Sequence, residues 1–154
     1  IGQYGALRGI GAVVGALIGG VLIERVGRRG SAYGVVALVS LAAVGFGAAT
    51  GATMVIWLGL LWGAIWASQE TIFFALAMDI ADTRIAASMF ALMMAISNLG
   101  AAVADGAATA LSDNLGFVNV FFVLAALNLI TLPVLWRLFR VAPEIAGRGT
   151  KGRI

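Results

Sequence analysis

Residues 20–29 read Gly-Val-Leu-Ile-Glu-Arg-Val-Gly-Arg-Arg and decide the fold, because they join a helix end, an acid and three arginines in one tight turn. On both sides lie apolar runs, each long enough to cross a bilayer. Short loops rich in arginine are retained on the cytoplasmic side of a membrane. The stretch therefore predicts a cytoplasmic hinge between two transmembrane helices.

The composition places the whole chain in lipid. Of its residues 62% are hydrophobic and only 11% are charged, and the mean hydropathy is +1.04. A soluble domain of this size cannot hide so much apolar surface. Residues 30–69 contain no charged side chain, which is most of two spans at about 20 residues a crossing. We predict an all-α membrane protein in contact with membrane lipid.

Missing residue types exclude several functions. The chain has no cysteine and no histidine, so it lacks disulfides, thiolate and imidazole metal ligands, and the usual general base. It also lacks a serine-based catalytic motif, and we expect no enzyme, no metal and no cofactor. The net charge of +3 lies in short turns and the tail, which favours membrane orientation over binding of nucleic acid.

The sequence predicts five transmembrane helices in one bundle over residues 1–140. Short connections make them antiparallel neighbours. The predicted spans are residues 4–23, 32–49, 54–78, 85–104 and 117–136. Residues 141–154 lose the apolar pattern, and we expect a mobile basic tail there.

The basic residues predict the orientation. Almost all fall on one side of the predicted spans: Arg25, Arg28, Arg29, Arg84, Arg137, Arg140, Arg148, Lys151 and Arg153. The positive-inside rule makes that side, with the C-terminus, cytoplasmic. Five crossings leave the N-terminus outside, and because the chain begins with Ile1 we expect a piece of a longer protein whose preceding helices are missing.

Glycines repeat every four residues in two of the predicted spans. Gly11, Gly15 and Gly19 form one row, and Gly59 and Gly63 form another. In lipid, helices associate through close approach at small residues rather than through a hydrophobic force. The rows predict a groove on each span that admits a partner backbone. The alternative is that glycine is simply frequent in this sequence.

The opening stretch resembles the signature loop of the major facilitator superfamily, which follows the second helix of each six-helix half. The matching positions are Gly20, Glu24, Arg25, Gly27, Arg28 and Arg29, with Glu24 where the family has aspartate. The resemblance implies that the five spans are helices eight to twelve of such a bundle, with helix two as the alternative for the first span.

The resemblance also implies a function: part of a secondary active transporter in the cell membrane, moving a small solute by alternating access, with a coupling proton as an option. Its partners would be the missing N-terminal helices of the same protein. The alternative is a non-transporting membrane scaffold or assembly factor on the same fold. A narrower likeness to muropeptide permeases and acetyl-CoA transporters rests on residues 69–71, 79–84 and 89–100, and it names no substrate.

Four polar residues inside the spans are candidates for substrate or proton binding: Glu70, Gln69, Arg8 and Asn98. A carboxylate near the middle of a span costs about 2.5–3.5 kcal/mol unless it faces a cavity or a partner. Glu70 is therefore the strongest candidate, with a structural ion pair as the alternative. Arg8 is expected to face Glu70, to bind an anionic group or to snorkel to the outer headgroups. Asn98 can contact substrate or a neighbouring helix.

The cytoplasmic ends supply a candidate gate. Its residues are Gly20, Glu24, Arg25, Gly27, Arg28, Arg29, Asp79, Asp82 and Arg84. We expect the three loop arginines to pair with the two aspartates, and Glu24 to lie close to residues 83–86. We also expect Asp82 and Thr83 to cap the helix that follows. The alternative is that the arginines only orient the helices during insertion.

The remaining conspicuous side chains are expected to serve structure. The third span carries five aromatic residues at helical spacing: Trp57, Trp62, Trp66, Phe73 and Phe74. Such residues are more often packing or interface anchors than a binding box. A structural role is also expected for Asn128 and Pro133 in the fifth span.

Overall fold

The computed structural model describes residues 2–82 and 84–147. In this part of the chain the helices are α1 (Gly2–Val26), α2 (Arg28–Gly47), α3 (Ala52–Ile80), α4 (Ala86–Leu115), α5 (Phe117–Leu129), α6 (Thr131–Val141) and α7 (Pro143–Gly147). Five segments are long and apolar enough to cross a membrane, and α5 with α6 forms the last of them. The prediction of an all-α membrane protein with five spans is confirmed.

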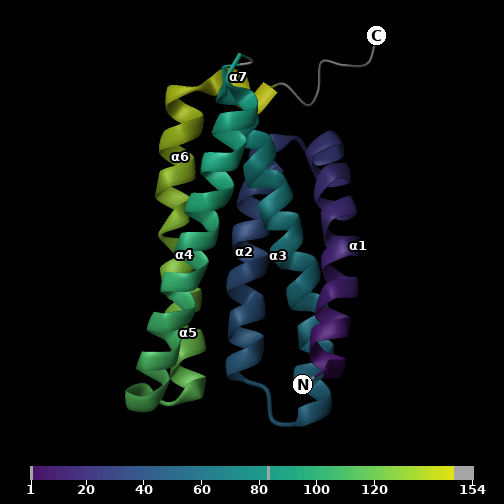
Figure 1. Cartoon of the computed structure of the whole chain (residues 1–154), viewed down its shortest axis with the longest axis vertical. Helices are drawn as coiled ribbons and strands as arrows, with labels where there is room; N and C mark the ends of the chain where they lie inside the picture. Colours follow the sequence, from purple (N-terminus) through teal and green to yellow (C-terminus); the bar gives the residue numbers. More distant parts are fainter. Residues whose placement is uncertain (1, 83, 148–154) are drawn as a thin grey trace.

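The helices stand side by side, with the N-terminus and α7 at opposite ends of the bundle (Figure 1). α2 and α3 occupy the middle, α1 covers one flank, and α4, α5 and α6 cover the other. α2 contacts α1, α3, α5, α6 and α7 and holds more buried residues than any other described helix. α4, by contrast, has no buried residue. The core therefore surrounds α2, while α4 packs only loosely at the edge of the bundle.

The fourth helix is longer than predicted. α4 continues to Leu115, about three turns past the expected end at residue 104. Residues 105–115 do not break the helix, because polar side chains such as Thr109 and Asn114 donate to carbonyls of their own helix. The helix stops where Gly116 takes a φ of 77°, which glycine adopts without steric cost.

The C-terminal segment also differs from the prediction. Residues 143–147 form α7, and Ile145 is only 2% exposed, so a mobile tail is wrong for these residues. The side chain of Ile145 packs into the core around α2, and this burial removes apolar surface from water. The rest of the predicted tail, residues 148–154, lies outside the described residues.

The predicted glycine grooves are confirmed, because α1 and α3 meet along them. Gly11, Gly15 and Gly19 are buried against α3. A Cβ atom built on Gly15 would overlap the backbone of Ala64. The Ser68 hydroxyl lies 2.7 Å from the Gly15 carbonyl oxygen and 2.8 Å from the Ala64 carbonyl oxygen, so its proton is shared between the two helices. The close approach that glycine allows, together with the hydrogen bond that Ser68 shares, holds α1 and α3 together.

The last span is interrupted near its middle, as Pro133 requires. Proline lacks the N–H that would bond to the residue four positions earlier, and the Ile130 N–H closes a tighter turn onto the Leu127 carbonyl at 3.0 Å. Just before the interruption, the Asn128 amide donates to the Val36 carbonyl at 2.9 Å and to the Ser40 hydroxyl at 3.0 Å. Asn128 thus ties α5 to α2, which supports its expected structural role.

Replacing Asn128 with leucine is expected to lower the free energy of unfolding by about 0.6–1.7 kcal/mol, the range measured for hydrogen bonds between membrane helices. The loss stays modest because Ser40 keeps its own bond to the Ala125 carbonyl at 3.3 Å. Unfolding of the purified full-length protein in mixed micelles would measure it. Asn119→Leu is the control, since the exposed Asn119 amide donates to the Leu115 carbonyl across the α4–α5 turn and makes no described bond to α2. Equal losses in both variants would refute a tie between α2 and α5.

Candidate functional site

A cavity of about 340 Å³ lies between α3 and α4 and contains the strongest sequence candidate. Its lining consists of Trp66, Gln69, Glu70, Phe73, Phe74 and Ala77 from α3, and Met93, Ile96 and Ser97 from α4. Glu70 follows Trp66 by four residues and precedes Phe73 and Phe74 by three and four, so these side chains share one face of α3. The cavity is therefore an aromatic recess with one carboxylate.

The Glu70 carboxylate has no neutralising partner in the part of the chain that the structure describes. It makes no hydrogen bond or ion pair there, and its side chain is half-buried. The neighbouring Gln69 has its Oε1 atom buried and without a hydrogen-bond donor among those residues. Two polar groups are thus held at membrane depth with spare bonding capacity, which is costly unless something else satisfies them.

Two of the predicted site residues do not line the cavity. Arg8 is exposed, and its backbone lies against Gly63. Gly63 is two turns, or roughly 10 Å, from Glu70 along α3. The expectation that Arg8 faces Glu70 is therefore wrong for this structure. Asn98 is also exposed, whereas the preceding residue, Ser97, lines the cavity.

The aromatic residues of α3 divide into three groups. The expectation that such residues pack is supported by the ring contacts Trp62–Trp66 and Phe74–Phe90. Trp66, Phe73 and Phe74 line the cavity. Trp62 does pack, with its ring centroid 5.8 Å from that of Phe46, and Trp57 is 62% exposed on the outside of the bundle. Spacing relative to Glu70 was the only signal that could have separated them.

One end of the cavity is closed by an aromatic pair. The ring centroids of Phe74 on α3 and Phe90 on α4 are 5.5 Å apart. This contact lies on the side of Glu70 toward Asp79, which is nine residues and roughly 13 Å further along α3. The α4 residues of the lining, Met93, Ile96 and Ser97, were not predicted, since nothing in an evenly apolar helix marks its inward face.

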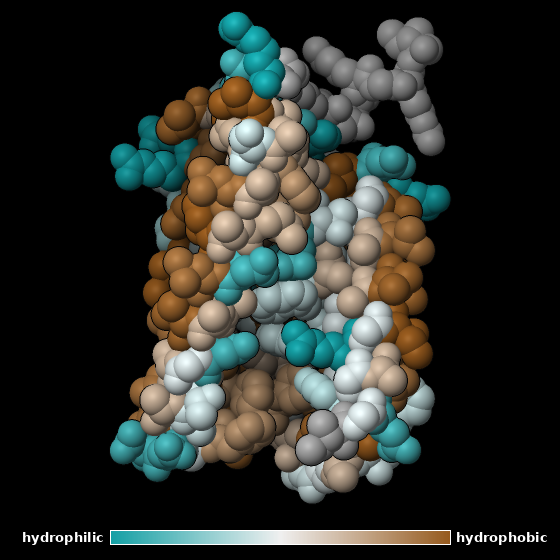
Figure 2. Space-filling model, viewed as in Figure 1, coloured by the Kyte–Doolittle hydropathy of each residue, from teal (hydrophilic) through white to brown (hydrophobic). Residues whose placement is uncertain are grey.

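The face of the bundle seen in Figure 2 has apolar flanks and a more polar centre. Figure 2 shows brown, hydrophobic side chains along both flanks, while hydrophilic and small side chains gather at mid-height between them. The basic ends of α1, α2 and α6 lie at the same end of the bundle as α7 (Figure 1). Basic side chains of three helices are thus gathered at one end of the bundle.

One ion pair connects the signature loop to α3. The Arg28 side chain binds Asp79 through two nitrogens, Nε to Oδ2 and Nη2 to Oδ1, the latter at 3.1 Å. The two side chains are only 17% and 15% exposed. Gly27 permits this arrangement, because its φ of 83° reverses the chain between α1 and α2 in a single residue. Because this ion pair is partly buried and bonded at two points, it fixes both the orientation and the separation of the Arg28 and Asp79 side chains.

The other expected gate contacts are absent among the described residues. Glu24, Arg25 and Arg29 are exposed and form no ion pair there. Asp82 instead accepts a 2.9 Å hydrogen bond from the backbone N–H of Arg84, whose side chain lies 3.8 Å from it. Short-range bonds of this kind form more readily than a bridge across the loop.

Placing Glu24 beside the start of α4 is wrong for the described part of that helix. α1 and α4 make no contact because α3 lies between them. α4 begins at Ala86 after Ile85, with no side-chain cap, so capping by Asp82 is also wrong. Thr83, the other expected cap, lies outside the described residues.

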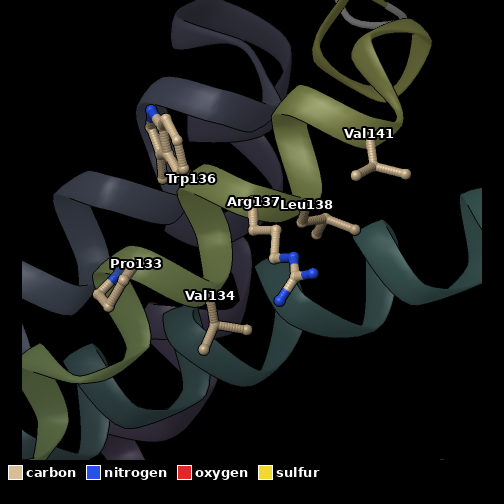
Figure 3. A pocket seen from close by; sticks show the side chains of 6 residues that line it. All are labelled: Pro133, Val134, Trp136, Arg137, Leu138 and Val141. Atoms are coloured by element: carbon tan, nitrogen blue, oxygen red, sulfur yellow. The ribbon is translucent and has the colours of Figure 1, made fainter.

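A second, shallower groove of about 690 Å³ lies along α6. Figure 3 shows its lining residues, Pro133, Val134, Trp136, Arg137, Leu138 and Val141. The Arg140 guanidinium lies 5.2 Å from the centroid of the Trp136 ring. Aromatic and basic side chains at a helix end, with apolar ones beside them, are typical of a surface that meets lipid. In the described part of the chain, the lining of this groove contains no carboxylate and no second helix.

Comparison with known proteins identifies the family. No curated protein and no solved structure matches the chain. A family model described as Major Facilitator Superfamily matches residues 1–153, nearly the whole chain. The match covers all five membrane-spanning segments and the loop that carries Arg28. The chain is a multi-pass membrane protein that belongs to the Major Facilitator Superfamily.

Proposed function

We propose that this chain is part of a secondary active transporter that moves a small solute by alternating access, together with N-terminal helices of the same protein. One observation carries the proposal: in a chain of a transporter family, Glu70 stands without a described partner in a cavity at membrane depth. We assign no enzymatic activity. We also name no solute from the likeness to muropeptide permeases and acetyl-CoA transporters, which the comparisons do not support.

Glu70 and Gln69 are assigned to binding of the solute or of a coupling proton, because both present unsatisfied oxygens at the cavity. The Arg28–Asp79 pair is assigned to the gate, because it joins the signature loop to the end of α3, roughly 13 Å from Glu70. We place the basic end and the C-terminus in the cytoplasm and the protein in the plasma (inner) membrane.

The orientation makes a direct prediction. In a cysteine-free form of the full-length protein, a cysteine at Gly30 should be protected from an impermeant thiol reagent in intact cells, because arginine-rich turns stay inside. Cysteines at Gly51 and Asn114 should react. Reaction at position 30 from outside, with a clean result at position 51, would invert the assignment.

Alternating access can be tested without knowing the solute. Ser97 lines the cavity, so a cysteine there should react with impermeant reagents applied from either face, in right-side-out and in inverted vesicles. A transporter opens the same cavity to each side in turn. A scaffold or assembly factor has no need to, so reactivity confined to one face under every condition would favour that alternative.

The gate assignment predicts a shift in this reactivity. Arg28→Ala leaves Asp79 without the described side chain that binds it at two points, and we expect several-fold faster labelling of the Ser97→Cys cavity site from the cytoplasmic face. Arg29→Ala is the matched control, since Arg29 is exposed and has no ion pair among the described residues. If Arg28→Ala instead leaves access unchanged and disturbs insertion, the loop is a topology signal and not a gate.

A further inference from the structure

The cavity between α3 and α4 has a chemistry that limits what it accepts. Among the residues that the structure describes, the lining includes a single charged side chain, the Glu70 carboxylate, and no arginine or lysine. An anionic solute would meet a negative charge with nothing to balance it, in a site of low dielectric. The wall formed by this chain therefore disfavours carboxylates and phosphates.

Polyhydroxyl solutes also fit this wall poorly. Beyond Glu70, its side-chain hydrogen-bonding groups are the Gln69 amide, the Ser97 hydroxyl and the Trp66 N–H, and the other lining residues are apolar. A sugar buried here would leave most of its hydroxyls without partners, at a cost of about 1–3 kcal/mol each. The solute should instead bring a large apolar surface and few polar atoms.

Three aromatic side chains line the same cavity as the carboxylate. Trp66 lies one turn before Glu70 on the same face of α3, and Phe73 and Phe74 lie one turn after it. Aromatic faces attract cations, and the attraction grows when the cation is removed from water. A carboxylate among such rings offers a positively charged group both an opposite charge and aromatic surfaces.

From these features we infer that the solute is a monovalent organic cation with an apolar body, bound through Glu70 and the rings of Trp66, Phe73 and Phe74. This inference rests on the proposed transport function and specifies its substrate class. A cavity of about 340 Å³ lies at the small end of the usual range for ligand sites. A solute built around one ring, with a substituted ammonium group, matches that size.

The unpaired state of Glu70 supports a cationic ligand over a structural ion pair. No described residue binds its carboxylate. The backbone of Arg8, the arginine expected to face it, lies about two turns away along the α1–α3 contact. A bound cation would supply the missing charge while the solute is present.

Phenyltrimethylammonium is a suitable probe, because it keeps its charge at every pH and carries one ring. We expect saturable binding to the purified full-length protein by isothermal titration calorimetry. Glu70→Gln should weaken it at least tenfold, Phe73→Leu several-fold, and Glu70→Asp less than Glu70→Gln. Benzoate, an anion of similar size, should not compete. Asp113→Asn, which changes an exposed acid at the far end of α4, should bind like the wild type.

The outcomes separate this inference from the proposed function. If Ser97→Cys is labelled from both faces but the wild type does not bind phenyltrimethylammonium, the protein alternates access and the solute class is wrong. Binding that survives Glu70→Gln overturns the inference as well. If the probe binds through Glu70 while Ser97→Cys reacts from one face only, the cation site stands and the transport function fails.

Discussion

Replacing Gly15 with alanine is expected to cost the full-length protein at least about 3 kcal/mol of stability, the upper end of the usual range for overpacking. The added methyl group would overlap the Ala64 backbone, which cannot turn away as a side chain would. α1 and α3 would have to separate, and the hydrogen bond from Ser68 to the Gly15 carbonyl would lengthen beyond 2.7 Å. Thermal unfolding and yield after size-exclusion chromatography would measure the loss.

Gly9→Ala provides the matched control. Gly9 lies in the same helix, but no described atom outside that helix's own backbone and the adjoining residues comes within 4 Å of a Cβ built there. Alanine is also the better helix former, by about 1 kcal/mol. A Gly15→Ala protein as stable as Gly9→Ala would show that the α1–α3 groove does not hold the bundle together.

Replacing Glu70 with glutamine is expected to abolish transport, by at least about 100-fold, while expression and unfolding temperature stay near those of the wild type. The substitution keeps the shape and removes the charge, and no described ion pair is lost with it. Removing a charge from membrane depth also relieves part of its insertion cost. The measurement is uptake into proteoliposomes, under an imposed proton gradient, of a solute that the wild-type protein accumulates.

The contrary outcomes at this position have different meanings. Loss of folded protein without a specific defect in uptake would indicate a structural ion pair, with a partner outside the described residues. Near-normal uptake would remove Glu70 from the site altogether. Asp105→Asn is the control for charge alone, because Asp105 is an exposed acid of α4 outside the cavity lining.

The features that follow from chain chemistry alone could be predicted from the sequence. Apolar length predicts the number of spans, since lipid thickness is fixed. The four-residue spacing of Gly11, Gly15 and Gly19 predicts a groove that admits a partner backbone, because small residues let helices approach closely. That α3 is the partner is seen only in the structure. Glu70 stands out because a carboxylate is expensive in lipid, and the structure places it at a cavity.

Which side of each apolar helix points into the bundle could not be predicted from the sequence. A membrane helix is apolar all round, so the pattern that separates inside from outside in a soluble helix is missing. Trp57 and Trp66 are the same residue type in the same helix, yet one faces outward and the other lines the cavity. Arg8 was expected to face Glu70 because the family resemblance implies that such helices border one central cavity, but the register of the glycine contact separates the two residues.

The contact between α1 and α3 also matters while the protein is being synthesised. Gly15 and Ala64 are 49 residues apart, and a ribosome adding about 5–20 residues per second needs roughly 2–10 s to deliver the second after the first. Until then the glycine face of α1 lies in the bilayer without the helix it fits. Newly made protein should therefore be most open to membrane proteases and to the wrong neighbours in this interval. A slower ribosome would lengthen that exposure without any change in the finished structure.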